Sequence, residues 1–253
     1  MKKLVKGLLL TAFWVSTAFT LPAFAGTKVV NCDEGDSLQA ALDSGRGSAA
    51  PVEIELYGTC EEMITIPRDQ VAIFGIDGAT IFGQVRHFGV SNVTLRDLTI
   101  TGPGNGILAR GGRMRLIGVN LIENYDHGVR AHDGAAVNLS RSQVGNNGGP
   151  FGIVAHGSNV NLNFTDVYGH PEYGVAVTDN SVANINGGSI TGNGEGVYGN
   201  NSVITVRDTW IGDNSGMGVS LAGSRGHLFD VTVSGNGSIG LYVNFTGSAA
   251  VYG

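Results

Sequence analysis

Short runs of alternating hydrophobic and polar residues, separated by turns rich in glycine and asparagine, fill most of the chain. A glycine followed by an aliphatic residue recurs at a nearly constant interval, at Gly106-Ile107, Gly128-Val129, Gly152-Ile153, Gly174-Val175, Gly196-Val197, Gly218-Val219 and Gly240-Leu241. Two further alternating runs follow within each interval, and a period of two predicts strands, not helices. The sequence therefore predicts three short strands in each repeat of about 22 residues.

A repeat of this size cannot bury its own apolar face, but a stack of such repeats can. Each strand would pair with its counterpart in the next repeat, about 4.8 Å away, and the apolar sides would form one continuous core. The predicted fold is an all-β parallel β-helix with about 22 residues per coil. Looser versions of the pattern at residues 71–74, 80–82, 93–95 and 98–100 extend it toward the N-terminus.

Two local features fit this solenoid. The segment Ser37-Leu-Gln-Ala-Ala-Leu42 has good amphipathic helical character, and we expect it to cap the open N-terminal end. Asparagines recur near one phase of the repeat, where their amides would bond from coil to coil in a turn; they are Asn124, Asn146, Asn193, Asn214 and Asn236. His170, beside Pro171, is expected at the surface of a turn.

The N-terminal segment 1–25 is predicted to be a signal peptide. Lys2, Lys3 and Lys6 form a basic start, residues 8–20 are apolar, and Ala23-Phe-Ala25 has the pattern of a cleavage site. The run is short for a membrane anchor, and no second run approaches the roughly 20 residues that span a bilayer. We therefore expect a periplasmic or secreted protein whose mature chain has no membrane span.

Cys32 and Cys60 are the two cysteines of the chain. In an oxidising compartment they are predicted to form a disulfide, because the competing interpretations, a metal pair or a catalytic thiol, lack a nearby histidine cluster. Residues 26–62 are assigned to an N-terminal cap and residues 63–253 to the β-helix. The last coil is expected to be incomplete. Three explanations stay open: the final residues fold across the end, the end docks on a partner, or the sequence is truncated.

Composition and charge argue against several classes of protein for this chain. Glycine makes up 41 of the 253 residues without a G-X-Y period, which excludes collagen, and 42% hydrophobic residues argue against a disordered chain. Loss of the three lysines of the predicted signal peptide would take the net charge from −6 to −9. A chain of this charge is not expected to bind nucleic acid.

The helical segment at residues 37–42, the segment Val71-Ala-Ile-Phe-Gly75 and the repeats of residues 106–240 together resemble the right-handed parallel β-helix proteins of the pectate-lyase-like superfamily. The resemblance implies right-handed winding, which the repeat length alone does not give. The superfamily includes polysaccharide lyases, hydrolases and epimerases, and also surface proteins without known activity.

The alternation within the repeats places one group of basic side chains on the outer face of three adjacent coils, within about 10 Å of one another. We call this group, Arg110, Arg130, His132 and His156, the arginine–histidine patch. Arginine can bind the carboxylates of a uronate polymer, and histidine can transfer a proton. The predicted catalytic residues are His132, His156, Arg130 and Asp133, and the predicted substrate-binding residues are Arg110, His127, Asp126 and Tyr198. The alternative is an ordinary solvated strand face.

The known chemistries of the superfamily match only in part. No calcium-binding acidic cluster with an arginine base is found, and Gly169-His-Pro171 lacks the pattern of the polygalacturonases. Lys28 is the one lysine of the mature chain, so a lysine base is not expected. The segments at residues 124–128 and 131–133 loosely resemble mannuronan epimerases and alginate-type lyases, without the Asp-Pro-His segment of that family. No cysteine–histidine spacing suggests zinc, and neither a metal nor a cofactor is predicted.

Two functions remain open. The first is an exported β-helix protein that binds an acidic polysaccharide and modifies it by lyase or epimerase chemistry. The second is a non-catalytic cell-envelope or surface rod for adhesion or assembly. The sequence does not choose between an enzyme and a binding protein.

Overall fold

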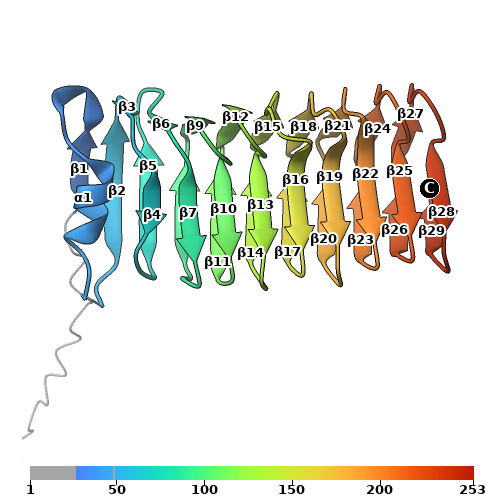
Figure 1. Ribbon diagram of the computed structural model, residues 1–253, viewed down its shortest axis with the longest axis horizontal. Helices are drawn as coiled ribbons and strands as arrows, with labels where there is room; N and C mark the ends of the chain where they lie inside the picture. The colour runs from blue at the N-terminus through green and yellow to red at the C-terminus, as the bar shows by residue number, and fades with distance from the viewer. Residues whose placement is uncertain (1–26, 48) are drawn as a thin grey trace, which may run out of the picture.

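The computed structural model describes residues 27–47 and 49–253, so the predicted signal peptide lies outside the described residues. The chain forms a right-handed parallel β-solenoid whose coils follow one another along its long axis (Figure 1). Each complete coil contributes one strand to each of three parallel sheets, here called A, B and C. The predicted fold class is confirmed.

Sheet A has eleven strands in chain order. They are β1 (Lys28–Asn31), β2 (Val52–Tyr57), β5 (Val71–Gly75), β8 (Val93–Arg96), β11 (Arg113–Ile117), β14 (Ala136–Ser140), β17 (Asn159–Asn163), β20 (Val182–Asn186), β23 (Val203–Arg207), β26 (Arg225–Phe229) and β29 (Ser248–Tyr252). Their registers are regular, so that one column of partners passes from coil to coil: Leu116 pairs with Leu139, and Leu139 pairs with Leu162.

Sheets B and C have nine strands each. Sheet B contains β3 (Thr59–Cys60), β6 (Thr80–Phe82), β9 (Thr99–Gly102), β12 (Asn120–Asn124), β15 (Gln143–Gly145), β18 (Asp166–Tyr168), β21 (Ser189–Thr191), β24 (Trp210–Gly212) and β27 (Thr232–Ser234). Sheet C contains β4 (Ile64–Ile66), β7 (Val85–Phe88), β10 (Ile107–Arg110), β13 (Val129–His132), β16 (Phe151–His156), β19 (Tyr173–Thr178), β22 (Glu195–Asn200), β25 (Val219–Ala222) and β28 (Leu241–Asn244).

The core is the column of alternate side chains that point inward from all three sheets. In sheet C, for example, Ile107 and Ala109 are fully buried, as are Val129 and Ala131 one coil later. The glycine before each aliphatic residue is needed because the chain approaches the next coil closely there. A Cβ added at Gly106 would lie 2.7 Å from the carbonyl oxygen of Gly128, closer than real Cβ atoms come. This contact explains why glycine recurs at this phase of the repeat.

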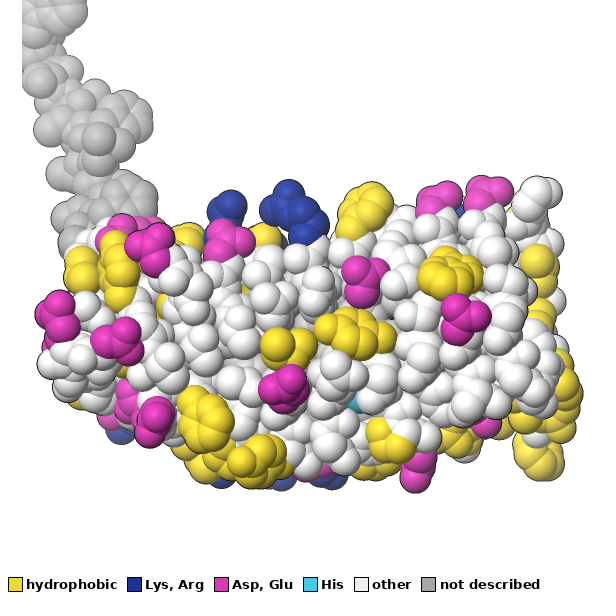
Figure 2. All heavy atoms as spheres, turned by 90° about the horizontal axis from the view of Figure 1, so that it is seen from above, with side chains coloured by type: hydrophobic (Ala, Val, Ile, Leu, Met, Phe, Trp, Pro, Cys, Tyr) yellow, Lys and Arg dark blue, Asp and Glu magenta, His cyan; other side chains and the backbone are white. Residues whose placement is uncertain are grey.

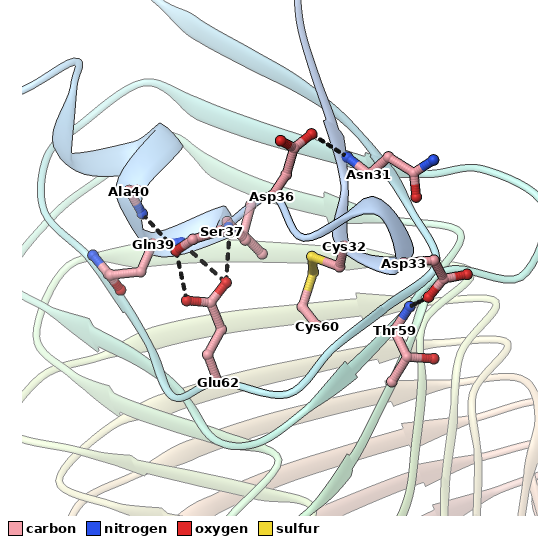
Figure 3. The surroundings of a disulfide bond; sticks show 11 residues. Asn31, Cys32, Asp33, Asp36, Ser37, Gln39, Ala40, Thr59, Cys60 and Glu62 are labelled. Atoms are coloured by element: carbon pink, nitrogen blue, oxygen red, sulfur yellow. Dashed lines mark hydrogen bonds between the residues drawn. A yellow bond between two sulfur atoms is a disulfide. The ribbon is translucent and has the colours of Figure 1, made fainter.

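The N-terminal end is covered by α1 (Leu38–Asp43), which confirms the predicted capping helix (Figure 1). Leu38 and Leu42 are fully buried against the first coils. Ser37 is the N-cap, and its hydroxyl accepts a hydrogen bond from the amide of Ala40. The carboxylate of Glu62 accepts a hydrogen bond from the amide of Leu38 over 2.6 Å, so a loop of the following coil fixes the start of the helix (Figure 3).

The predicted disulfide joins Cys32, which begins the short 3-10 helix η1 (Cys32–Glu34), to Cys60 in β3 (Figure 3). Their Cα atoms are 5.1 Å apart. Glu62 lies close to both sulfur atoms, and the three side chains form a group with metal-ligand spacing among the described residues. Because the two sulfurs are bonded to each other and Glu62 caps α1, we assign this group a structural role.

At the other end, β28 and β29 pair with β25 and β26 on one side. Several large hydrophobic side chains are exposed there, among them Phe245, Val251 and Tyr252. An end-to-end partner at this edge stays a prediction. No helix in the part of the chain that the structure describes is long and apolar enough to cross a membrane.

A row of polar side chains, buried except for the half-buried Asn236, follows the turn between sheets B and C. We call it the asparagine ladder; its members are Asn124, Asn147, His170, Asn193, Asn214 and Asn236. The amide of Asn124 donates to Oδ1 of Asn147 over 2.9 Å, and Asn193 donates to Asn214 over 3.1 Å. The predicted coil-to-coil ladder is present, but two of its residues differ from the prediction.

The first correction concerns Asn146, which is exposed, whereas the adjacent Asn147 is buried in the ladder. The coil from Gly128 to Gly152 is longer than the coils on either side of it, so the inward position moves by one residue. The second concerns His170, which is only 2% exposed. Asn147 donates to Nε2 of His170 over 3.1 Å, and Nδ1 of His170 donates to Asn193 over 3.0 Å. An imidazole with one donor and one acceptor can thus take the place of an amide.

Candidate functional site

The arginine–histidine patch is built by three neighbouring strands of sheet C, β10, β13 and β16. Arg110 pairs in register with His132, and His132 pairs with His156. Arg130 lies on the same side of β13 as His132. Because the intervening Ala131 points into the core and is fully buried, the basic side chains project outward. The structure therefore brings the four residues together, while their role in binding or catalysis stays a prediction.

A pocket of about 360 Å³ lies over β13 and β16. Its lining combines predicted site residues with apolar side chains, namely His127, Arg130, Ala131, His132, Asp133, Phe151, Val154 and His156. Arg110 does not line it but contacts His132 from the preceding coil. The pocket thus offers a cation, imidazole rings and an apolar wall within one depression, which suits an anionic ligand with a carbon skeleton.

Both ring nitrogens of His132 are occupied. Nε of Arg110 donates to Nε2 of His132 over 3.0 Å, and Nδ1 of His132 lies 3.1 Å from a carboxylate oxygen of Asp133. Partial burial lowers the pKa of His132, the charge of Arg110 lowers it further, and Asp133 opposes the shift. We infer a neutral ring held between a guanidinium and a carboxylate, with Nδ1 carrying the proton.

His156 differs because one of its nitrogens is free. Its Nδ1 lies 2.7 Å from a carboxylate oxygen of Asp179 and 3.1 Å from the hydroxyl of Thr178. No other described residue forms a hydrogen bond to Nε2. A carboxylate that holds the Nδ1 proton directs the Nε2 lone pair outward, which is the arrangement of a general base.

Asp179 was not among the predicted site residues. It occupies the turn after β19 in the left-handed region, with φ of 54°, one coil beyond His156. The sequence carried a sign of it, because the pair Thr178-Asp179 repeats the position of His132-Asp133 two coils earlier. Acidic residues in the turn that follows a sheet C strand therefore lie next to the outward column of that sheet.

His127 forms a wall of the pocket and is only 7% exposed. Its ring stacks on Phe151 with centroids 5.1 Å apart, and its Nε2 lies 3.4 Å from a carboxylate oxygen of Asp126. Burial is the main cause that lowers the pKa of His127, and Asp126 opposes it. Asp126 itself is not part of the pocket lining. Of these two predicted binding residues, His127 is thus placed to contact a ligand directly.

Tyr198 lies outside the pocket, two coils beyond Val154 in the same outward column. A row of rings connects it to the pocket: Tyr173 stacks on Tyr198 at 4.7 Å, and Phe151 lies 5.5 Å from Tyr173. Phe151 and Tyr173 were missed, although each directly precedes a repeat glycine, as His127 does. The accessible faces of half-buried rings in such a row can pack against sugar residues.

The patch does not continue through His87 on the preceding coil. His87 pairs with Ala109, points into the core and is fully buried, whereas its neighbour Arg86 pairs with Leu108 on the outer face. On the face seen in Figure 2, hydrophobic and acidic side chains are scattered and little histidine is visible.

Comparisons with known proteins agree with the geometry of the fold. No curated protein matches the chain. The mannuronan C-5 epimerase AlgE4 A-module of Azotobacter vinelandii is similar in structure, with a TM-score of 0.69, 19% identity, and coverage of 88% of this chain and 75% of that one. An alginate lyase from Paenibacillus sp. str. FPU-7 has a TM-score of 0.47 and 17% identity over 86% of this chain and 99% of that one. PfbA, a surface adhesin of Streptococcus pneumoniae, has a TM-score of 0.34 and 10% identity over 89% and 91%.

These structural similarities concern the fold alone, because the identities of 19%, 17% and 10% are too low to carry a function. The sequence itself matches the family described as right handed beta helix region over residues 84–253, which is two thirds of its length. Three parallel sheets, the regular register and this match lead to one conclusion: the chain belongs to the right-handed β-helix family.

Proposed function

We propose that this protein is an exported enzyme that binds an acidic polysaccharide in the pocket over β13 and β16 and removes a proton from a uronate residue. The observation that carries the proposal is the position of His156, which lines the same pocket as Arg130 and whose Nε2 forms no hydrogen bond with a described residue. Binding and catalysis thus have separate groups within one depression. The predicted signal peptide and the disulfide support export.

The chemistry follows from the carboxylate of the sugar. The proton on the carbon next to that group is removed more easily when the carboxylate charge is compensated, and Arg130 can provide this through charge-assisted hydrogen bonds. Nε2 of His156 accepts the proton, while Asp179 holds the Nδ1 proton and stabilises the imidazolium. His132, fixed by Arg110 and Asp133, lies beside His156 on the neighbouring strand as the second candidate proton-transfer group.

Two outcomes are open to the resulting carbanion. If it expels the glycosidic oxygen on the neighbouring carbon, a carbon–carbon double bond forms, and the leaving oxygen takes a proton from an acid. If it is reprotonated from the opposite face, the sugar is epimerised and the chain stays intact. The AlgE4 A-module, which shares the fold of this chain, is named as an epimerase, and the reaction proposed here is of that class. Both outcomes need a base and a proton donor: His156 is the proposed base, and His132, its register partner in β13, is the candidate donor for the leaving oxygen, while reprotonation of the opposite face would take its proton from water.

The experiment compares the wild type with His156→Asn and Asp179→Asn on alginate and pectate. We expect activity to fall by about 100-fold or more for His156→Asn, since general acid–base catalysis contributes about that much, and by less for Asp179→Asn. Lyase activity is measured by absorbance of the unsaturated product and epimerase activity by proton NMR of the polymer. His227→Asn, on sheet A, is the matched control and should keep full activity.

A wild-type protein that neither binds nor alters these polymers would contradict the proposal, as would full activity in His156→Asn. Binding without any reaction would favour the alternative, a non-catalytic surface rod for adhesion or assembly. The exposed apolar side chains near β29 support an end-to-end partner for such a rod.

A further inference from the structure

A second depression lies on the outer face of sheet A, separate from the pocket on sheet C. It crosses β11, β14, β17 and β20 and has a volume of about 550 Å³. We call it the amide groove; it is lined by Arg113, Arg115, Ile117, Ala136, Asn138, Ser140, Asn159, Asn161, Asn163, Val182 and Asn184. None of these residues lines the pocket on sheet C. At one coil per strand, the groove extends over about 14 Å along the solenoid.

The floor of the groove is a row of hydrogen-bonded side-chain amides. Asn138, Asn161 and Asn184 are register partners in adjacent strands. Asn161 donates to Oδ1 of Asn138 over 2.6 Å, and Asn184 donates to Oδ1 of Asn161 over 2.8 Å. An amide has two donor hydrogens and two acceptor lone pairs. The middle amide therefore keeps one donor and one acceptor for a ligand, and the row holds all three in a fixed orientation.

The charge of the groove is opposite to that of the whole chain. Its lining contains Arg113 and Arg115 and no acidic residue, although the net charge of the chain is −6. Both arginines are exposed, and neither forms an ion pair with any described residue. A guanidinium in this position is free to bind a carboxylate with two parallel hydrogen bonds.

We propose that the amide groove is a second, non-catalytic binding site for an acidic oligosaccharide lying along the solenoid axis. The hydroxyl groups of successive sugars, which both donate and accept, would bond to the amides of successive coils. A carboxylate would bind Arg115 and Arg113 at the β11 end. The inference rests on the proposed function only for the class of ligand, because the groove shares no residue with the pocket.

Such a site would give one polysaccharide two points of attachment, or would hold a second chain. The pocket and the groove lie on different sheets of the same coils, since β13 continues into β14 and β16 into β17. Two linked contacts raise the apparent affinity for a long polymer well above that for a short oligomer. The groove would thus keep the protein on its polymer between reaction cycles.

The test is an NMR titration of the full ¹⁵N-labelled chain with short oligomannuronate and oligogalacturonate. We expect the side-chain amide signals of Asn161 and Asn184 to shift and reach saturation. Arg115→Gln should weaken the affinity read from these signals about 10-fold. Arg225→Gln is the matched control, because Arg225 lies in the same register column as Arg113, farther along the solenoid and outside the groove. A neutral oligosaccharide of equal length should bind more weakly.

The imidazole signals of His132 and His156 report on the pocket in the same titration. If these shift while the groove amides do not, the second site is overturned and the proposed function stands. If only the amides shift, the groove is supported and the proposed function fails. If neither the imidazole signals nor the amide signals shift, both proposals are contradicted. If Arg115→Gln binds the acidic oligosaccharide as tightly as the wild type does, or if the neutral oligosaccharide binds as tightly as the acidic one, the groove does not select an acidic ligand.

Discussion

Two stacks of polar side chains run along this solenoid at the spacing of its coils, and they differ in their surroundings. In the asparagine ladder, His170 is buried and both of its ring nitrogens are bonded to the amides above and below. In the arginine–histidine patch, His156 is exposed and its Nε2 is unbonded within the described residues. The same residue type therefore stabilises the fold in one stack and is available for chemistry in the other.

Whether a polar column faces the core or the solvent therefore decides its role more than the residue type does. A buried polar group must be hydrogen-bonded, because an unpaired one costs about 1–3 kcal/mol. On the outer face water meets that requirement, so bonding capacity can stay open for a ligand. Changes in the ladder should consequently alter stability, whereas changes in the patch should alter activity.

The largest expected effect is that of Asn193→Ala. Asn193 accepts hydrogen bonds from the backbone and ring of His170 and donates to Asn214 and to the carbonyl of Val167. Its loss leaves several buried groups unpaired, so we expect the free energy of unfolding to fall by about 3 kcal/mol. Chemical denaturation of the full chain measures this change. Asn184→Ala, which removes an outward amide with one bond to Asn161, should cost less than about 1 kcal/mol. Equal losses would contradict the distinction between buried and outward polar columns.

The next largest effect is the contribution of His170 to the pH dependence of the free energy of unfolding, which His170→Asn should remove. Burial lowers the pKa of His170 from 6.5 to about 4, so the unfolded chain binds a proton more readily than the folded one between these pH values. The free energy of unfolding is therefore lower at pH 4 than at pH 7, by up to about 3 kcal/mol from this residue. Asparagine fills the equivalent position in the other coils of the ladder and does not titrate.

Denaturation curves of wild type and His170→Asn at several pH values test this. Burial also lowers the pKa of His87 and of His127, so both proteins should lose stability in acid, but the wild type should lose more. The difference between them should grow as the pH falls from 6.5 to 4. Parallel curves over that range would show that His170 does not titrate as its burial requires.

The smallest expected effect on stability is that of the double variant His132→Asn, His156→Asn. Both side chains project outward, His156 exposed and His132 partly buried, and surface substitutions of this kind change the free energy of unfolding by about 0.5 kcal/mol or less. The same variant should lose the proposed polysaccharide reaction. A loss of stability as large as that of Asn193→Ala would mean that the patch is part of the framework and not a site.

Much of this architecture could be predicted from sequence because the repeat is regular. Spacing and alternation predict the strands and the columns of sheet C, the amphipathic segment at residues 37–42 predicts the capping helix, and the presence of two cysteines in an expected oxidising compartment predicts the disulfide. Prediction failed where the repeat was irregular: the longer coil from Gly128 to Gly152 moved the ladder from Asn146 to Asn147. The sequence also predicts His170 at the surface because Pro171 indicates a turn there, but the ring is buried in the ladder. A residue's neighbour in the next coil, such as Asp179 beside His156, was also missed.

The coil length, the inward and outward sides of each strand and the residues of the patch follow from the local sequence, because a period of two in each strand leaves few alternatives. Which ring nitrogens form hydrogen bonds depends instead on how the coils pack against one another. Partners such as Asp179 and His156 belong to successive coils and meet through stacking, and burial of His170 depends on which side of a turn faces the core. Hydrogen bonding and desolvation, which separate a structural histidine from an available one, are properties of that packing and not of the local sequence.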